Sequence, residues 1–193
     1  MKILTGTLRG QTILFKANRQ LRPTTDKTRK AIFDILGGAV ENTRVLDLYS
    51  GTGALGFEAL SQGAAHVTFV EHDPSSCQKI RENLRRFKFE GSVELCQADV
   101  LDWVRRHDGK TRVAPFDLIL FDPPYQTGLA VETLLAVSQS GLLSGRGFLV
   151  LECRRKEDAP QETPLLHAIR QKRYGQTKVL IYAAKPGSAP IVD

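Results

Sequence analysis

Short apolar runs alternate with amphipathic stretches along most of this chain of 193 residues. From Arg44 onwards, each apolar run is followed by a segment in which apolar residues recur at helical spacing. Short, wholly apolar runs are typical of parallel strands that helices cover on both faces. The alternation therefore predicts an α/β fold with a doubly wound, mainly parallel sheet. The expected parallel strands are 45–48, 67–70, 93–96, 118–121 and 148–151.

Helix signals fill the gaps between these strands, at residues 54–62, 74–87, 99–106 and 129–137. Gly63 is a typical C-cap for the first helix, and Asp73 followed by Pro74 is a typical start for the second. Two further strands are expected at 168–174 and 178–183. A tight turn at Gly175 joins them, so they must form an antiparallel hairpin and complete a seven-stranded sheet.

The first 40 residues follow a different pattern. Residues 2–16 contain short β-type stretches broken at Arg9 and Gly10, which predicts a β-hairpin. A helix should follow, because capping side chains at 24–26 precede apolar residues at helical spacing and Gly37-Gly38 ends the pattern. We therefore expect an N-terminal hairpin-and-helix extension (1–40) packed on a catalytic core (41–184), and a frayed tail (185–193).

Charge is concentrated in the same extension. The chain has a formal net charge of +6, from 27 Lys and Arg against 21 Asp and Glu. Residues 1–40 hold eight of the basic residues and two of the acidic ones, which accounts for the whole excess. A basic arm beside a neutral body indicates contact with nucleic acid more strongly than a high pI does. A solvated surface of no special function would have the same composition.

Composition gives no sign of a metal site, of export or of a membrane. Three cysteines lie far apart without a C-x-x-C pair, and the four histidines are also widely spaced. The first residues lack the apolar stretch of a signal peptide. No apolar run approaches the roughly 18–20 residues that span a bilayer. We expect a cytoplasmic protein that binds no metal and no membrane, and a monomer, since no long apolar stretch requires a partner.

A glycine loop follows the first strand of the expected core, where residues 45–56 read VLDLYSGTGALG. Open α/β sheets bind ligands at the carboxyl ends of their parallel strands. Gly51, Gly53 and Gly56, with Glu71 twenty residues after the first glycine, match the dinucleotide fingerprint. They suit S-adenosylmethionine equally well, because it also has a ribose. A structural turn that binds no ligand is the simplest alternative.

Two acidic residues bear on the choice of cofactor. Asp47 precedes the glycines, and its carboxylate would attract the ammonium group of S-adenosylmethionine but repel a pyrophosphate. This favours S-adenosylmethionine, with an NAD(P)-dependent oxidoreductase as an alternative. Asp99, after the third strand, could accept a hydrogen bond from the adenine amino group, or cap the following helix. The two roles are compatible.

The motif Asp-Pro-Pro-Tyr follows the fourth strand, at residues 122–125. Consecutive prolines fix the backbone and have no N–H, so the Asp122 carboxylate and the Pro123 carbonyl remain as acceptors. Hydrogen bonds from an exocyclic base amine to both would favour a pyramidal nitrogen with its lone pair free. Tyr125 offers a stacking face for a base, worth about 1–3 kcal/mol. The motif indicates methyl transfer to a base amine, although a rigid turn would look the same.

Six segments carry a resemblance to a known family. They are LRGQTI (8–13), RPTTDKTRKAIFDIL (22–36), VLDLYSGTGALGFEALSQGA (45–64), FVEHD (69–73), FDLILFDPPY (116–125) and KRYGQTKVLIY (172–182). Together they resemble the bacterial 16S ribosomal RNA (guanine-N2) methyltransferases that modify guanine 966, within the Asp-Pro-Pro-Tyr class. The glycine loop and Asp-Pro-Pro-Tyr occur in many methyltransferases, whereas the segment 22–36 is far more specific.

The resemblance implies a Rossmann-like class I methyltransferase. It would transfer a methyl group from S-adenosylmethionine to a guanine N2 amine of 16S rRNA, in an assembled or partly assembled 30S subunit. The catalytic residues would be Asp122, Pro123, Pro124 and Tyr125. The cofactor would be bound by Asp47, Ser50, Gly51, Thr52, Gly53, Glu71, His72, Asp99 and Thr25. RNA would be bound by Arg9, Arg22, Lys27, Arg29 and Lys30.

Three alternatives to this function stay open. An adenine-N6 methyltransferase is the nearest, because the same motif suits that amine. An NAD(P)-dependent oxidoreductase and a non-catalytic RNA-binding protein of ribosome assembly are the others. The segment 22–29 is expected to cover the donor site, in contact with the donor carboxylate, with RNA or with both.

Overall fold

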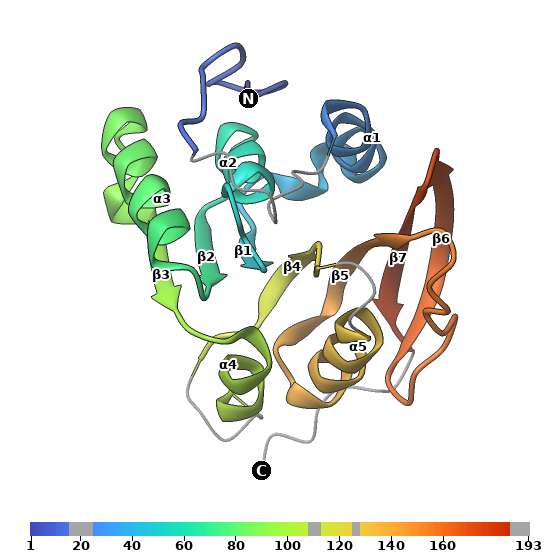
Figure 1. Cartoon of the computed structure of the whole chain (residues 1–193). Coiled ribbons are helices and arrows are strands. Elements are labelled where there is room, and N and C mark those ends of the chain that lie inside the picture. The colour runs from blue at the N-terminus through green and yellow to red at the C-terminus, as the bar shows by residue number, and fades with distance from the viewer. Residues whose placement is uncertain (16–24, 108–112, 125–127, 186–193) are drawn as a thin grey trace.

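Seven strands form one mixed sheet in the computed structural model, which describes residues 1–15, 25–107, 113–124 and 128–185. Their order is β3-β2-β1-β4-β5-β7-β6 (Figure 1). The first five pair in parallel, β7 runs antiparallel to β5, and β6 runs antiparallel to β7. The strands are β1 (Arg44–Leu48), β2 (His66–Glu71), β3 (Val93–Gln97), β4 (Phe116–Phe121), β5 (Leu143–Arg154), β6 (Leu166–Tyr174) and β7 (Thr177–Ala184).

Helices cover both faces of this sheet. In Figure 1, α1, α2 and α3 lie on one face, and α4 and α5 lie on the other. Each layer has its own apolar cluster, because alternate strand residues point to opposite faces. The prediction of a doubly wound α/β fold is confirmed. The helices are α1 (Asp26–Leu36), α2 (Ala54–Ser61), α3 (Pro74–Phe87), α4 (Val100–Arg106) and α5 (Leu129–Ser140), with short 3₁₀ turns η1 (Gly37–Val40) and η2 (Glu90–Ser92).

Helix boundaries follow the capping signals of the sequence. Thr25 caps α1, since its Oγ1 accepts a hydrogen bond from the Thr28 N–H at 3.2 Å. Asp73 caps α3 in the same way, with Ser76 N–H at 2.7 Å from its Oδ2. Each cap satisfies a backbone donor that would otherwise have no partner in the first helical turn.

The predicted N-terminal β-hairpin is only partly correct. The chain does reverse direction, and Lys2 and Thr12 form an antiparallel bridge. Within residues 1–15, however, no continuous strand forms. Other backbone N–H groups of this segment bind α2: Leu4 N–H donates to Glu58 Oε1 (2.6 Å) and Thr7 N–H to the Ser61 carbonyl (2.7 Å). The two arms are still paired by backbone hydrogen bonds, from Ile3 N–H to the Gln11 carbonyl (2.9 Å) and from Ile13 N–H to the Met1 carbonyl (2.9 Å). The extension is therefore a short, irregular hairpin that is also attached to α2.

Gly6 permits this attachment. A Cβ at that position would lie 1.9 Å from the Ser61 carbonyl oxygen, and the residue has φ +73°. Both features exclude a side chain. At the other end of the described chain, Lys185 is still ordered by a hydrogen bond from its N–H to the Leu165 carbonyl at 2.9 Å. The rest of the expected tail, 186–193, lies outside the described residues.

Two searches concern only the described part of the chain. It contains no helix that is long and apolar enough to cross a membrane. Nor does it contain a group of three or more His, Cys, Asp or Glu side chains placed to hold a metal ion.

Candidate functional site

The loop between β1 and α2 places the glycine segment at the carboxyl edge of the sheet. Tyr49, Gly51 and Gly53 all adopt positive φ angles, of 57°, 53° and 75°. Such angles are easy for glycine but uncommon for tyrosine. Tyr49 is held there by its hydroxyl, which lies 2.7 Å from Thr133 Oγ1 on α5. Burial raises the pKa of Tyr49 to about 12, so the phenol stays neutral.

The glycine turn is also tied to β2. The hydroxyl of Ser50 donates to the Asp47 carbonyl at 2.7 Å and reaches the Val70 carbonyl at 3.2 Å. The Gly53 N–H closes the turn by donating to the Ser50 carbonyl at 2.6 Å. Thr52 is buried within this turn. Ser50 and Thr52 therefore shape the loop, whatever contact they make with a ligand.

Asp47 is a buried carboxyl beneath the loop, with 1% of its surface exposed. Its Oδ2 accepts a hydrogen bond from the Gly56 N–H at 2.9 Å, in the first turn of α2. Burial raises the pKa of Asp47 to about 8, the Gly56 hydrogen bond opposes this, and the nearby Glu71 and Asp122 carboxylates raise it further. Burial and, to a smaller extent, two neighbouring carboxylates thus disfavour the ionised form of Asp47.

Glu71 joins the glycine loop to the loop after β2. Its Oε2 accepts a hydrogen bond from the Gly51 N–H at 2.7 Å, and its Oε1 accepts one from the Asp73 N–H at 2.7 Å. His72 is exposed, with Nδ1 3.0 Å from Glu71 Oε1. Glu71 thus lies in contact with the glycine loop, as its spacing predicts.

Asp99 is the N-cap of α4. Its Oδ1 accepts a hydrogen bond from the Asp102 N–H at 3.1 Å, while the residue remains exposed. The capping role that the sequence allowed is confirmed. An adenine contact stays a prediction, and the exposed carboxylate leaves an oxygen to make it.

Asp122 continues β4 on the same edge. Phe121 pairs with Leu48 of β1 and with Leu151 of β5, so Asp122 follows directly at the end of the strand. It is half-buried, Pro123 is buried and Pro124 is exposed. Tyr125 lies outside the described residues. The structure thus brings Asp47, Glu71 and Asp122 together, from the ends of three adjacent strands.

Sequence reasoning missed a fourth carboxyl, Glu152. It lies one residue beyond Leu151 on β5, beside Asp122 in the parallel register. Only 2% of its surface is exposed. Val150 belongs to the cluster on the α1–α3 face, and the alternation of strand residues puts Glu152 on that face as well. An acidic residue inside the apolar run FLVLEC was the signal for it.

The prediction that Arg29 binds RNA is wrong. Its side chain is completely buried. Its Nε lies 3.1 Å from Glu58 Oε1, and its Nη2 lies 2.9 Å from Asp26 Oδ1. The guanidinium therefore joins α1 to α2 and cannot reach RNA in this structure. Sequence spacing could have indicated this, because Arg29 shares the apolar stripe of α1 with the buried residues Ile32, Phe33 and Leu36.

The other expected RNA-binding residues divide between exposed and undescribed positions. Arg9 and Lys27 are exposed, and Lys30 is exposed with an ion pair to Asp34 at 2.7 Å. Arg22 lies outside the described residues. Thr25, expected near the cofactor, is exposed and caps α1.

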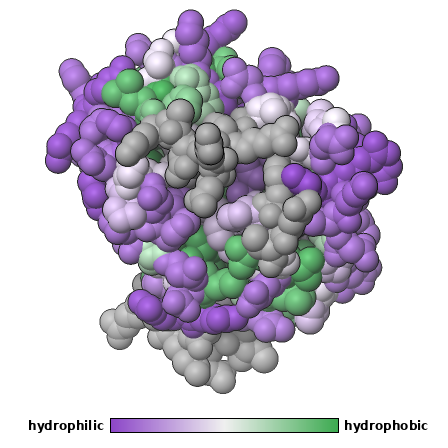
Figure 2. Space-filling view, viewed as in Figure 1, coloured by the Kyte–Doolittle hydropathy of each residue, from purple (hydrophilic) through white to green (hydrophobic). Residues whose placement is uncertain are grey.

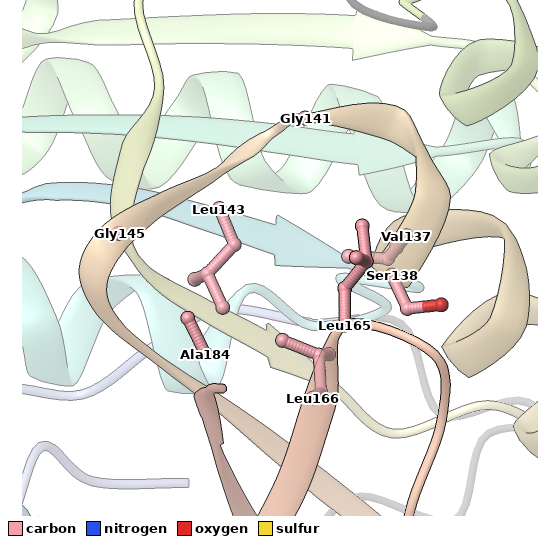
Figure 3. A pocket seen from close by; sticks show the side chains of 8 residues that line it. All are labelled: Val137, Ser138, Gly141, Leu143, Gly145, Leu165, Leu166 and Ala184. Carbon is pink, nitrogen blue, oxygen red and sulfur yellow. The ribbon is translucent and has the colours of Figure 1, made fainter. Parts of the chain in front are cut away.

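An apolar pocket lies away from this edge, where α5 ends and β5 begins (Figure 3). The amino ends of parallel strands face the opposite edge from the glycine loop, so this pocket is separate from the carboxyl cluster. Its lining contains no charged side chain and offers nothing to hold a charged ligand. The lining residues are Val137, Ser138, Gly141, Leu143, Gly145, Leu165, Leu166 and Ala184.

Comparison with known proteins places this architecture among methyltransferases. The family described as "Conserved hypothetical protein 95" matches residues 1–183. The ribosomal RNA small subunit methyltransferase D of Buchnera aphidicola (Acyrthosiphon pisum strain) is 33% identical over 155 residues, which cover 80% of this chain and 78% of the relative. The solved structure of yhhF from Escherichia coli has a TM-score of 0.85 at 26% identity, covering 96% of this chain and 98% of the other.

A more distant neighbour shares the fold alone. It is a 16S rRNA N2 methyltransferase from Thermus thermophilus, solved in complex with AdoMet and guanosine. The TM-score is 0.63 at 22% identity, and the match covers 92% of this chain and 46% of that protein.

Proposed function

This chain belongs to the Conserved hypothetical protein 95 family, and we propose from that premise that it transfers a methyl group from S-adenosylmethionine to a guanine N2 amine of 16S rRNA. One observation carries the proposal: three carboxyl groups, of Asp47, Glu71 and Asp122, surround a glycine loop in left-handed conformation at the carboxyl edge of a Rossmann-like sheet. The named relatives that resemble the chain over most of its length are methyltransferases of the small-subunit rRNA.

The carboxyl cluster fits a cationic donor. Burial raises the pKa of the Asp47 carboxyl, and the negative charges of Glu71 and Asp122 raise it further. S-adenosylmethionine carries an ammonium and a sulfonium group, and when bound it supplies a methyl group that a nucleophile can accept. A pyrophosphate in the same place would be repelled. This electrostatic fit favours S-adenosylmethionine over NAD(P).

Residues of the glycine loop and residues in contact with it would bind different parts of S-adenosylmethionine. Gly51 and Gly53 let the backbone approach the methionine part of the donor. Glu71, already in contact with the loop, would accept hydrogen bonds from ribose hydroxyls. His72 would border the same group, and Asp99 would face adenine from the start of α4. Ser50, Thr52 and Asp47 would hold the loop in shape, with Asp47 also attracting the donor ammonium.

The chemistry at the amine depends on Asp122 and its prolines. The Asp122 carboxylate and the Pro123 carbonyl would accept hydrogen bonds from the two amine hydrogens, which leaves the nitrogen lone pair directed at the methyl carbon. A C–N bond forms as the C–S bond breaks, and the amine proton then leaves to an acceptor or to water. Pro124 keeps the turn rigid, and Tyr125 would stack on the base. Catalysis would consist mainly of orientation and electrostatics.

A base amine can react only when the base is unpaired or withdrawn from a helix. Single-stranded loops of ribosomal RNA present such bases. The exposed cations Arg9, Lys27 and Lys30, with Arg22, would contact phosphates near the site. We propose that the enzyme acts in the cytoplasm as a monomer, on 16S rRNA in an assembled or partly assembled 30S subunit.

The test uses small subunits isolated from cells that lack this protein. With S-adenosylmethionine labelled in its methyl group, the wild-type chain should label 16S rRNA, and mass mapping should give N2-methylguanosine. Asp122→Ala should abolish labelling while calorimetry still detects donor binding. Labelled N6-methyladenosine would assign the adenine alternative. Binding of NAD(H) without binding of S-adenosylmethionine would contradict the proposal, and rescued subunit assembly without labelling would assign the non-catalytic role.

A further inference from the structure

The β6–β7 hairpin lies at the same edge of the sheet as the carboxyl cluster. β5 runs parallel to β4, so its carboxyl end reaches the edge where Asp122 is found. Arg154 at that end pairs with Thr177, the first residue of β7. The next residue, Arg155, donates its N–H to the Gln176 carbonyl at 2.8 Å, in the hairpin turn. The turn between β6 and β7 is therefore fixed beside the candidate site.

Five exposed basic side chains gather on this hairpin and on the end of β5. They come from two segments that are 14 or more residues apart in the sequence, which is why the composition did not reveal them. We call them the hairpin basic surface: Arg155, Lys156, Arg170, Lys172 and Arg173.

Strand register shows which way part of this surface faces. Arg170 pairs with Ile181 and Lys172 pairs with Val179. Both β7 residues belong to the cluster under α1, α2 and α3, and directly opposed residues project to the same face. Arg170 and Lys172 thus stand on the face that also carries α1, with exposed Lys27 and Lys30. In Figure 1, α1 lies next to the upper end of this hairpin, and Figure 2 shows hydrophilic side chains over that side of the molecule.

In the part of the chain that the structure describes, the basic residues of this hairpin differ from several on the helices in having no acidic partner. Some basic residues on α3 and α4 are paired with acids, as in Lys79–Glu82 (2.6 Å) and Arg105–Glu132 (2.8 Å). Within the described residues, by contrast, no ion pair joins the hairpin basic surface to an acid.

The acids closest to this surface in sequence have other contacts. Glu157 accepts hydrogen bonds from the Arg154 N–H with its carboxylate and from Lys178 Nζ with its carbonyl. Glu162 pairs with Lys185 at 3.1 Å. Asp158 is exposed and lies two residues after Lys156 in the sequence. The surface therefore keeps a local positive excess.

We propose that the hairpin basic surface binds RNA phosphates and forms, with α1, a second anchor for the substrate beside the target amine. The inference rests on the proposed function and goes beyond it, since the sequence assigned RNA contact to the first 40 residues alone. Phosphate contacts fix the position and register of a nucleic acid without reading its sequence. Phosphate contacts on the hairpin and on α1 would together hold the strand beside the nucleotide that must be withdrawn.

Basic residues on an edge strand have a second possible purpose, because they prevent sheets of two molecules from pairing at their edges. β6 is such an edge strand. The experiment therefore separates RNA binding from protection of the edge.

The test compares two variants with the same loss of charge. Arg170→Gln with Lys172→Gln removes two cations from the face of the hairpin that also carries α1. Arg106→Gln with Arg146→Gln removes two exposed cations from the opposite edge, at the end of α4 and the start of β5. Affinity for small subunits isolated from cells that lack this protein is measured from low to high salt. KM and kcat for methyl transfer, donor affinity, melting temperature and oligomeric state are measured for each variant.

The hairpin variant should bind RNA roughly 5- to 30-fold more weakly near physiological salt, as expected for one or two lost phosphate contacts. Its plot of log affinity against log salt should be shallower by about one unit per contact. KM for RNA should rise, while donor affinity, melting temperature and kcat at saturating RNA stay unchanged. The opposite-edge variant should match the wild type.

Unchanged RNA affinity and salt slope in the hairpin variant would overturn the inference. If that variant also forms oligomers, the charges serve to protect the edge. A wild-type chain that binds S-adenosylmethionine but methylates no RNA would instead overturn the proposed function. If the wild-type chain methylates RNA and the hairpin variant binds RNA as tightly as the wild type, only the proposal of RNA binding by the hairpin is overturned.

Discussion

Single residues in this chain have roles that their chemical type does not reveal. Arg29 belongs to a basic segment, yet it is buried between α1 and α2 and pairs with Glu58. Asp47 was expected to meet a ligand and also holds the Gly56 N–H. Residue type indicated that these side chains matter, whereas their partners, which are distant in sequence, decide what they do.

Arg29→Gln should destabilise the fold by about 3–5 kcal/mol, because it leaves the Glu58 carboxylate buried without its cation. Urea unfolding measures the loss. Lys27→Gln, on the exposed side of the same helix, should change stability by no more than about 0.5 kcal/mol. If the Arg29→Gln protein were stable but bound RNA more weakly, Arg29 would have an RNA-binding role after all.

The raised pKa of Asp47 predicts a pH-dependent stability. The unfolded carboxyl titrates near 3.8 and the folded one at about 8, so between these values the folded state binds more protons. Its contribution to stability is therefore present at low pH and is lost as pH rises towards 8. In Asp47→Asn, whose amide oxygen can still accept from Gly56, the free energy of unfolding should fall less between pH 5 and 9. If the free energy of unfolding depended on pH in the same way in both proteins, the raised pKa of Asp47 would be contradicted.

At the scale of elements, local signals predicted much and tertiary contacts explain the rest. The sequence predicted the helix caps at Thr25 and Asp73 and the apolar strands of the parallel sheet. Each of these features depends on residues that are neighbours in the sequence. The start of β5 could not be predicted, because Ser144 to Gly147 is polar and glycine-rich and forms an irregularity between the pairs Phe116–Leu143 and Leu118–Phe148. The N-terminal hairpin was predicted only in part, since its arms do pair but contacts with α2, which lies far along the chain, fix its shape.

The packing of α2 on β2 depends on a missing side chain. A Cβ on Gly56 would lie 2.2 Å from the Phe69 ring and 3.0 Å from Asp47 Oδ2. Gly56→Ala should therefore displace the first turn of α2, destabilise the protein by about 1–3 kcal/mol and weaken binding of S-adenosylmethionine. Thermal melting and calorimetry report the two effects. Gly38→Ala, where a Cβ would meet nothing within 4 Å, should be close to neutral.

At the scale of the whole molecule, folding redistributes the charge seen in the sequence. The excess of +6 falls within residues 1–40, but Arg29 is withdrawn into the interior. Segments near 155 and 172, which balance acids elsewhere in the composition, meet as the hairpin basic surface. The carboxyl cluster was partly predictable, because parallel strands must end at one edge. The position of Glu152 and the hairpin basic surface could not be predicted, since only strand register places them at this edge.

The central pairing of the sheet has a kinetic consequence. β1 joins β4 across a long stretch of chain, and the hydrogen bond from Arg44 N–H to Asp117 Oδ2 spans 73 residues. β6 and β7 need only a tight turn to meet. Closing the longer loop costs more entropy and slows the contact. We therefore expect the hairpin to form early in folding and the glycine loop to meet the Asp122 turn late, so that the last contacts completed are those that bind the donor.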